Sequence, residues 1–462
     1  MSNSTYHSIT LIIAVFLVVF QWNITSPMAD WTDVAVPIQV TTAAKESHND
    51  RGLHRIVRVS GTTIALGDGV NNVPYHEGVY RSTDNGAHWS QILDLNYATR
   101  GAIVTGSGEM VYVFWMSVEV NPGIYLSKFH YDATPPAPAR IYTGYVTSVG
   151  GEYQTISPAV DANGNIYVVC HFAPSAGEYD RIWLLKSTDG GNTWSTPSVV
   201  DYLDGTSWTY PSLVVDHAGN LVVCYAEHAA AYLGGRADAD KRIYFRKSTD
   251  GGVTWGSRIR VDNPAGPFGV YNPCMIEDQS NNLYIFAQRA QAGLVMAKST
   301  DGGATWPGGF SVKVSTGDYA DPSAAVGSDG TLYVTIRKDN ECGAGALSWR
   351  NCMYQSTNGG VGWTQVAVYC GQSRVGPSGS VRYANWWNYG GPLEWCWEQY
   401  LSSNDNIRPV YYNINTDVSI WDRMQRPTRL GIDKTIKDYK SNPTQQNLNQ
   451  VLQFIDDYML GF

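Results

Sequence analysis

Apolar and polar positions follow one another in short runs along most of the chain. Runs of about four to eight apolar or aromatic residues end in clusters of Gly, Asn, Asp and Pro, which is typical of strands joined by tight turns. Four segments each read as strand, turn and strand: 158–171, 211–227, 273–288 and 322–337. A further apolar run follows, as in RIWLLK from Arg181 and RIYFRK from Arg242. The pattern predicts antiparallel hairpins that are extended by more strands.

One octapeptide occurs five times, each time after the third run of a unit. The copies are STDNGAHW (82–89), STDGGNTW (187–194), STDGGVTW (248–255), STDGGATW (299–306) and STNGGVGW (356–363). Successive copies start about 50 to 60 residues apart, except that the first gap is nearly twice as long. That gap predicts a unit without the octapeptide near Leu126, Ser127 and Lys128. A weaker copy at 415–421 would close the series.

The octapeptide has the chemistry of a tight hairpin. Its carboxylate or amide can accept hydrogen bonds from the backbone N–H groups of the turn, Gly can adopt positive φ, and Trp can pack beneath. With a fourth strand after the octapeptide, each unit holds four antiparallel strands. The repeat therefore predicts an all-β propeller of four-stranded blades. It has six blades, or seven if 377–415 forms a further one.

Both ends of the chain differ from this repeat. The segment 9–22 (ITLIIAVFLVVFQW) carries no charge and is shorter than the ~20 residues that a membrane-spanning helix needs. We interpret 1–29 as a signal peptide, with an uncleaved N-terminal anchor as the alternative. Residues 30–429 are predicted to form the propeller. In the tail, 430–462, apolar residues recur at helical spacing and predict a short C-terminal helix.

Composition narrows the class of function. Lys and Arg total 32 against 41 Asp and Glu, which gives a net charge of −9. Because no basic run stands out either, nucleic acid is excluded as a partner. Charged residues make up only 16% of the chain, while 30 Tyr and 16 Trp are present, as expected for an extracellular all-β protein.

The cysteines predict no metal site. None of the seven forms a CxxC pair and no His lies at zinc-finger spacing, so neither a metal nor another cofactor is expected. Cys342 and Cys352 flank a Gly-rich loop and are the best candidates for a disulfide. Cys170 and Cys224 lie in apolar runs and are expected to be buried thiols.

The pattern S-T-D-x-G-x-T-W is the Asp box, and its recurrence resembles the sialidase (neuraminidase) superfamily of BNR-repeat β-propellers. The resemblance extends from about residue 51 to 423. It implies that the boxes lie away from the substrate face. It also implies a retaining glycoside hydrolase that removes terminal sialic-acid-type residues from glycans with a tyrosine nucleophile and without a cofactor.

Three arginines share one position in the repeat. Arg181, Arg242 and Arg350 each stand six residues before the box serine. Six extended residues cover about 20 Å, a whole strand, so these side chains should lie at the face opposite the boxes. Sialidases hold the sugar carboxylate at that face with three guanidinium groups, whose fork suits a carboxylate. Arg55 lies in LHRIV, which resembles the family's Phe-Arg-Ile-Pro motif.

The resemblance therefore implies a substrate-binding triad of Arg55, Arg242 and Arg350, with Arg181 as a further binding residue. The alternative for each arginine is a structural one, in which it pairs with a neighbouring acid or stacks on a ring.

Catalytic residues are implied in the same way. Glu227 ends a second strand and matches the carboxylate that activates the nucleophile. Tyr383 is the nearest candidate for the attacking tyrosine. Asp68 or Glu77, both in the first unit, would act as the acid/base.

Other interpretations remain open. Glu227 could instead pair with Arg236 or Arg242, and Asp68 could be a turn residue. The whole chain could be a non-catalytic Asp-box propeller that binds carbohydrate or mediates adhesion, or a polysaccharide lyase on the same scaffold. In every case the expected partner is a glycan or glycoconjugate and the expected location is secreted or cell-surface. Membrane contact is expected only through an uncleaved anchor.

Overall fold

The computed structural model describes the strands of the repeat and many of the turns between them. The described residues are 38–39, 56–68, 77–84, 87–95, 98–117, 122–143, 156–172, 181–203, 209–228, 241–262, 269–289, 292–315, 322–327, 330–339, 349–370, 380–382, 393–398 and 410–415. The strands lie in one compact unit of the chain, which comprises residues 35–383 and 393–414.

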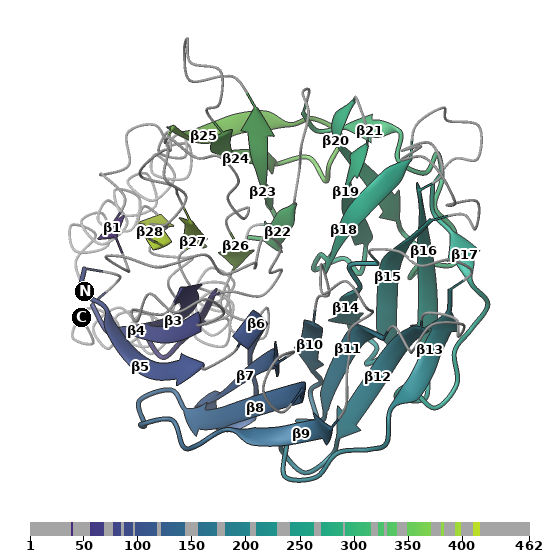
Figure 1. The fold of residues 1–462 in the computed structure, drawn as a ribbon. Helices are drawn as coiled ribbons and strands as arrows, with labels where there is room; N and C mark the ends of the chain where they lie inside the picture. The colour runs from purple at the N-terminus through teal and green to yellow at the C-terminus, as the bar shows by residue number, and fades with distance from the viewer. Residues whose placement is uncertain are drawn as a thin grey trace, which may run out of the picture. The chain divides into compact units, whose positions relative to one another are not determined.

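Seven sheets of four strands each make up the described part of the fold (Figure 1). Six of them, which we call blades 1 to 6, each contain four strands that are consecutive in the chain. The seventh, which we call the closing sheet, has the order β1-β28-β27-β26 and so joins one N-terminal strand to three C-terminal strands. The sequence predicted six or seven blades. The number is six when only blades 1 to 6 are counted and seven when the closing sheet is counted as well.

The strands have the following bounds. Blades 1 and 2 contain β2 (Ile56–Val59), β3 (Thr62–Asp68), β4 (Glu77–Ser82), β5 (Ser90–Leu95), β6 (Ala98–Thr105), β7 (Met110–Ser117), β8 (Gly123–His130) and β9 (Ala139–Thr143). Blades 3 and 4 contain β10 (Ile156–Val160), β11 (Ile166–Phe172), β12 (Arg181–Ser187), β13 (Ser198–Tyr202), β14 (Ser212–Val215), β15 (Leu221–His228), β16 (Lys241–Ser248) and β17 (Ile259–Arg260). Blades 5 and 6 contain β18 (Val270–Glu277), β19 (Leu283–Arg289), β20 (Gly293–Ser299), β21 (Val312–Lys313), β22 (Ser323–Val326), β23 (Leu332–Asp339), β24 (Trp349–Ser356) and β25 (Thr364–Cys370). The closing sheet contains β1 (Ile38–Gln39), β26 (Ser380–Arg382), β27 (Leu393–Glu398) and β28 (Val410–Asn415).

The first strand of each blade lies innermost, and these strands contact one another in order around the ring. Strand β26 contacts both β22 and β2, so the closing sheet lies between blades 6 and 1. Serine side chains link neighbouring inner strands: Ser157 Oγ accepts a hydrogen bond of 2.9 Å from Leu213 N, and Ser212 Oγ accepts one of 3.1 Å from Met275 N. The predicted propeller of four-stranded antiparallel blades is thereby confirmed.

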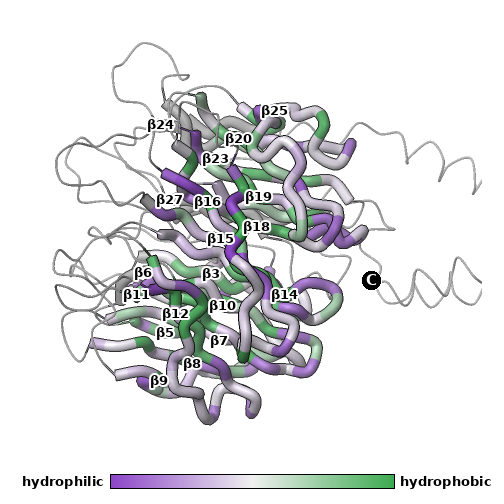
Figure 2. Tube along the Cα trace, turned by 90° about the vertical axis from the view of Figure 1, so that its right-hand side faces the viewer, coloured by the Kyte–Doolittle hydropathy of each residue, from purple (hydrophilic) through white to green (hydrophobic). Residues whose placement is uncertain are grey.

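Apolar side chains fill the space between neighbouring sheets. Phe245, Met275 and Ile285 belong to one buried cluster between blades 4 and 5. Figure 2 shows the same division along the chain, with apolar segments in the strands and hydrophilic residues at the turns. Cys170 and Cys224 are buried free thiols, as expected.

Several predictions can now be placed. The unit without the octapeptide is blade 2, whose third strand β8 contains Leu126, Ser127 and Lys128. The described residues include one short 3₁₀ segment, Ser107–Glu109, and no α-helix. Among these residues no helix is long and apolar enough to span a membrane. Segments 1–29 and 430–462 and Cys342 lie outside the described residues, so the signal peptide, the helical tail and the disulfide stay predictions.

The Asp box forms the hairpin that its sequence predicts. In blade 3, Asp189 Oδ1 accepts hydrogen bonds from the backbone N–H groups of Asn192 (3.0 Å) and Thr193 (2.9 Å). Gly190 and Gly191 have φ of 66° and 80°, which a side chain would disfavour. The carboxylate thus organises the turn, and hydrogen bonds from the Thr193 hydroxyl and N–H lower its pKa.

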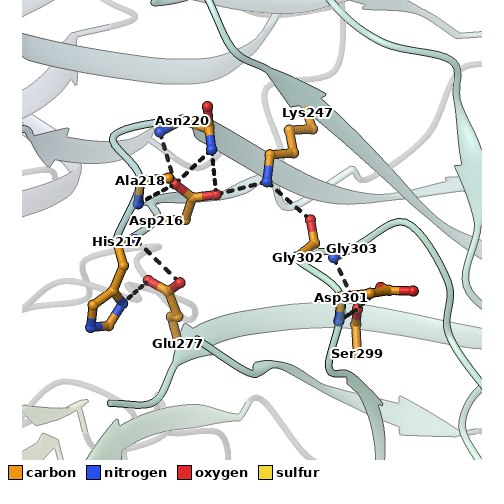
Figure 3. A network of polar contacts seen from close by, with 10 residues as sticks. All are labelled: Asp216, His217, Ala218, Asn220, Lys247, Glu277, Ser299, Asp301, Gly302 and Gly303. Atoms are coloured by element: carbon orange, nitrogen blue, oxygen red, sulfur yellow. Dashed lines mark hydrogen bonds and ion pairs between the residues drawn. The ribbon is translucent and has the colours of Figure 1, made fainter. Parts of the chain in front are cut away.

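The boxes of successive blades lie on one face, and from blade 2 to blade 6 a lysine links each blade to the next. The lysine that precedes the box serine, or its equivalent in blade 2, donates to a glycine carbonyl in the following box. The pairs are Lys128 with Gly190 (2.9 Å), Lys186 with Gly251 (3.3 Å), Lys247 with Gly302 (3.2 Å) and Lys298 with Gly359 (3.4 Å). Figure 3 shows the link from Lys247. We call this side of the propeller the box face and the opposite side the far face.

Candidate functional site

The repeat-equivalent arginines lie at the far face, as predicted. In the strand register Arg181 is opposite Phe172, Arg242 is opposite Glu227, and Arg350 is opposite Lys338. The box serines are paired at the other ends of the same strands.

Some predicted site residues cannot be placed. Arg55 and Tyr383 lie outside the described residues, and the side chains of Arg350 and Asp68 are likewise not described. Their proposed roles therefore stay predictions. Asp68 and Glu77 are cross-strand partners in blade 1.

The Glu77 side chain is fully buried. Its Oε2 accepts a hydrogen bond of 2.9 Å from the N–H of Gly101, which lies on the inner strand of blade 2. A buried carboxylate with a backbone partner suits a link between blades. This environment favours a structural role for Glu77 over that of the acid/base.

Arg181 and Arg242 each contact the outer part of their own blade. The Arg181 guanidinium carbon lies 5.5 Å from the ring centre of Tyr202 on β13. Arg242 Nε lies 3.9 Å from Oδ2 of Asp262, which follows β17. No described contact joins the two arginines directly. The residues that the fold does bring together are Arg242 and Glu227, which are opposite one another on β16 and β15.

Glu227 is part of a buried polar cluster between blades 3 and 4. Its carboxylate forms an ion pair with Arg258, whose guanidinium carbon lies 3.5 Å from the ring centre of Tyr244. In the same cluster, Tyr225 donates its phenol hydrogen to Asp201. Burial raises the pKa of Tyr225, which keeps this phenol neutral.

This cluster bears on the role of Glu227. Arg258 is a described ion-pair partner of Glu227, and Arg236 lies outside the described residues, so the pairing with Arg236 or Arg242 stays a prediction. The tyrosine nearest to Glu227 along its own strand, Tyr225, is fully buried, so it is not placed to attack a substrate. Arg258 therefore holds the Glu227 carboxylate within the protein. If Glu227 takes part in catalysis, it does so as the partner of Arg258.

A second cluster surrounds Asp262 at the far face of blade 4. Asp262 Oδ2 receives hydrogen bonds from Arg260 Nε (3.0 Å) and Nη2 (2.7 Å), and Oδ1 receives one from Ile243 N (3.1 Å). The Asp262 side chain is 6% exposed, whereas those of Arg242 and Arg260 are 24% and 33% exposed. A buried carboxylate thus fixes two guanidinium groups that still reach solvent.

Further cationic groups lie on the side of blade 4 that faces blade 5. Lys241 Nζ lies 3.8 Å from the ring centre of Tyr271 on β18. Arg289, at the end of β19, donates a hydrogen bond of 2.8 Å to the carbonyl of Phe310. Burial lowers the pKa of Arg289, and the Asp262 carboxylate partly counteracts this.

The backbone beside Tyr271 is unusual. Asn272 has φ of 55° immediately before Pro273, and the strand register shifts between Tyr271 and Cys274. Left-handed backbone at a residue other than Gly costs energy and is found preferentially at functional sites. Tyr210, which precedes a proline in blade 4, has φ of 42°. Both lie at the far-face end of an inner strand.

The sequence interpretation did not single out Lys241, Arg258, Arg260, Asp262 or Tyr271. A signal for three of them was present. In SRIRVD (257–262) charged and apolar residues alternate, which places Arg258, Arg260 and Asp262 on one side of a strand. For metal ions, the described residues contain no group of three His, Cys, Asp or Glu side chains arranged to bind one.

Comparison with known proteins places this geometry in context. Residues 156–368 match the BNR repeat-like domain family. Over 239 residues the chain is 25% identical to a xyloglucanase from Paenibacillus sp, and the match covers 47% of this chain and 21% of that protein. The chain thus spans about a fifth of the length of this curated relative.

Solved structures of other proteins are similar to this chain at low identity, and the ulvan lyase below shares the fold. An ulvan lyase bound to -[GlcA(1-4)Rha3S]- is 11% identical with a TM-score of 0.59, over 82% of this chain and 96% of the lyase chain. Trypanosoma rangeli sialidase is 15% identical with a TM-score of 0.43, over 88% and 61% of the two chains. The seven four-stranded sheets show a β-propeller, and residues 156–368 of this propeller are similar to the BNR repeat-like domain family.

Proposed function

We propose that this chain is a carbohydrate-active enzyme whose substrate is a negatively charged glycan bound at the far face of blades 4 and 5. The observation that carries the proposal is the pairing of Arg242 and Arg260 with the buried carboxylate of Asp262 at the far face of blade 4. Guanidinium groups held by a buried acid are pre-organised for a carboxylate or sulfate.

The relatives support a glycan as the ligand. The curated relative is a xyloglucanase, and the ulvan lyase was solved with -[GlcA(1-4)Rha3S]-, an acidic repeat. An acidic ligand also agrees with the sign of the charge at the far face of blade 4. The chain as a whole carries a net charge of −9, so this group of cationic side chains is a local feature.

The first candidate reaction is sialidase-type hydrolysis with retention. Arg55, Arg242 and Arg350 would hold the carboxylate of a terminal sialic-acid-type sugar, and Arg242 and Arg350 share the far-face position that this role needs. Tyr383 would attack the anomeric carbon, while Asp68 would give a proton to the leaving oxygen.

In that reaction Glu227 would take the phenol proton of Tyr383. Its ion pair with Arg258 would hold the carboxylate in place for this step.

The second candidate is β-elimination by a polysaccharide lyase. The observation that favours it is that Arg181 and Arg242 contact the outer strands of separate blades, which suits an extended chain better than one terminal sugar. A base would remove the proton beside a uronate carboxylate. The electron pair would form a C=C bond, and the glycosidic oxygen would leave with a proton. Arginines beside the carboxylate would stabilise the charge that develops.

One experiment separates these outcomes. The full chain is incubated with a fluorogenic sialoside and, separately, with uronate-containing polysaccharides, and free sugar and unsaturated products are measured. Arg242→Ala should lower turnover at least about a hundredfold, since one anchoring group for the charge is lost. Arg140→Ala, an exposed arginine on β9, is the matched control and should leave turnover unchanged.

The results assign the chemistry. Free sialic-acid-type sugar supports hydrolysis, and unsaturated products support elimination. Binding without turnover would select the non-catalytic propeller. Turnover that Arg242→Ala leaves intact would remove the proposed site.

A further inference from the structure

Lys241 and Arg242 are consecutive on β16, so their side chains leave opposite sides of the same sheet. The contacts agree with this. Arg242 lies beside Asp262, whereas Lys241 crosses to Tyr271 on β18, the inner strand of blade 5. The far-face end of blade 4 therefore carries one cationic group on each side.

The Arg242 position is built around two arginines. Asp262 Oδ2 accepts hydrogen bonds from both Nε and Nη2 of Arg260, and these two bonds fix the plane of the Arg260 guanidinium. Arg242 Nη1 donates to the carbonyl of Lys241 at 3.0 Å, which orients the second guanidinium. Two oriented guanidinium groups on one side of a sheet supply positive charge that suits a single carboxylate or sulfate.

The Lys241 position is built around an aromatic ring. The ammonium group of Lys241 lies over the Tyr271 ring, 3.8 Å from the ring centre, which is within the range of cation–π attraction. The left-handed backbone at Asn272 and the register shift beside it set the place of this ring. Arg289 on β19 also faces blade 4, because it is two residues beyond Ala287, which packs in the cluster between blades 4 and 5.

The separation of the two positions limits the ligand. Consecutive residues of a strand point to opposite sides of the sheet, so Lys241 and Arg242 would meet a ligand from different sides of blade 4. Two acidic groups on successive sugars of one chain can reach both positions.

Resting on the proposed function, we infer that the substrate is a polymer with acidic groups on successive sugars, which crosses the far-face end of blade 4 and contacts Arg242 with Arg260 on one side and Lys241 with Arg289 on the other. Tyr271 is a positioning residue that holds Lys241. A terminal acidic sugar would engage the first position alone.

Binding measured against chain length tests this inference. The full chain is titrated calorimetrically with one to eight sugars of a 1,4-linked uronic acid, with neutral oligosaccharides of equal length, and with free sialic acid. Affinity for the uronic acid should rise at least about tenfold once the oligosaccharide is long enough to reach Lys241 as well as Arg242. The contact with Lys241 is then made by a ligand that is already bound at Arg242. The neutral series should show no such rise.

Variants assign the rise to blade 4. Lys241→Ala should remove the gain with length and leave monosaccharide binding unchanged, whereas Lys241→Arg should retain the gain. Tyr271→Leu should reduce it. Lys313→Ala, an exposed lysine on β21, is the matched control and should behave as the unchanged chain.

Three results would count against the inference. Affinity for acidic sugars that does not depend on length would overturn it and leave the proposed function standing. A length gain that survives Lys241→Ala would also overturn it. If neither the acidic oligosaccharides nor the acidic monosaccharides bind, the proposed function fails together with it.

Discussion

Lys247 Nζ lies 2.8 Å from Asp216 Oδ2, which joins the third strand of blade 4 to the turn between its first two strands. The same ammonium group donates to the carbonyl of Gly302 in the Asp box of blade 5 (Figure 3). Burial raises the pKa of Asp216, but hydrogen bonds from Lys247 and Asn220 outweigh this effect and lower it. One side chain therefore connects a turn, a strand and the next blade.

Replacing Lys247 should destabilise the propeller. Lys247→Ala leaves the Asp216 carboxylate, which is 6% exposed, without its cation and leaves the Gly302 carbonyl without this donor. Loss of such a contact costs about 1–3 kcal/mol of the free energy of unfolding. Urea denaturation measures the loss. Lys313→Ala should change the same quantity by less than about 0.5 kcal/mol, and an equal loss in both variants would contradict the assigned role.

The Asp boxes should make stability depend on pH in the acid range. Hydrogen bonds from the side chain and backbone of Thr254, and then from Ser248, lower the pKa of Asp250 to about 2. Because this value is below that of an unfolded aspartate, about 3.9, the carboxylate stabilises the fold at neutral pH. This stabilisation is present above about pH 4 and is lost as the pH falls towards about 2.

The variant Asp250→Asn tests this dependence. One box of the chain already has an asparagine at this position. In the box of blade 6, Asn358 stands at the equivalent position, and its Oδ1 accepts a hydrogen bond of 2.8 Å from Gly362 N. The variant should therefore fold, with a lower melting temperature at neutral pH. Its difference from the unchanged chain should shrink as the pH falls from about 4 to about 2. A difference that stays constant over this range would contradict the prediction.

Alanine variants of two glycines distinguish the energetic cost of backbone strain from the cost of overpacking. Gly252 in the box of blade 4 has φ of +87°, and a Cβ there would overlap Leu184 Cδ2 of blade 3. Gly219 has a similar φ of +80°, but a Cβ would meet nothing within 4 Å. Both alanine variants should lose about 1–2 kcal/mol through the left-handed backbone. Gly252→Ala should lose a further 1–3 kcal/mol or so through overpacking. Equal losses in chemical denaturation would show that Leu184 yields without cost.

The fold was predictable because its information is local. Each box contains the carboxylate or amide, the glycine and the hydroxyls that make its own hairpin, so similar octapeptides mark equivalent turns. Even the unit without a box could be found, since only its spacing was needed. The outer strand of the closing sheet was not predicted, because β1 pairs with β28 across almost the whole chain.

The site was less predictable because its contacts join distant segments. The position of Arg242 at the far face follows from its distance to Ser248 along one strand. The partner of Glu227 does not follow from sequence distance. Glu227 lies on the second strand of blade 4 and Arg258 immediately precedes the fourth, so the two meet only once β15, β16 and β17 have paired. Strand parity in 257–262 marks the side that Arg258 takes but not the acid that it meets.

The Glu227–Arg258 pair decides whether this carboxylate is structural, chemical or both. Glu227 is 5% exposed and Arg258 is 23% exposed, so removing one partner leaves the other charge largely within the protein. Arg258→Met and Glu227→Gln should each lower the free energy of unfolding by about 2–4 kcal/mol. The double variant should lose less than the sum of the two, with a coupling of about 1–3 kcal/mol in a double-mutant cycle. A coupling near zero would mean that the ion pair contributes nothing to stability.

Turnover of the same variants tests the chemical role separately. If Glu227 accepts a proton in the reaction, Glu227→Gln should abolish turnover at temperatures where the variant is still folded, because the amide cannot act as a base. Arg258→Met should lower turnover less than Glu227→Gln, since the carboxylate remains and loses only the guanidinium that holds it in place. Full turnover by folded Glu227→Gln would leave Glu227 a purely structural residue between blades 3 and 4.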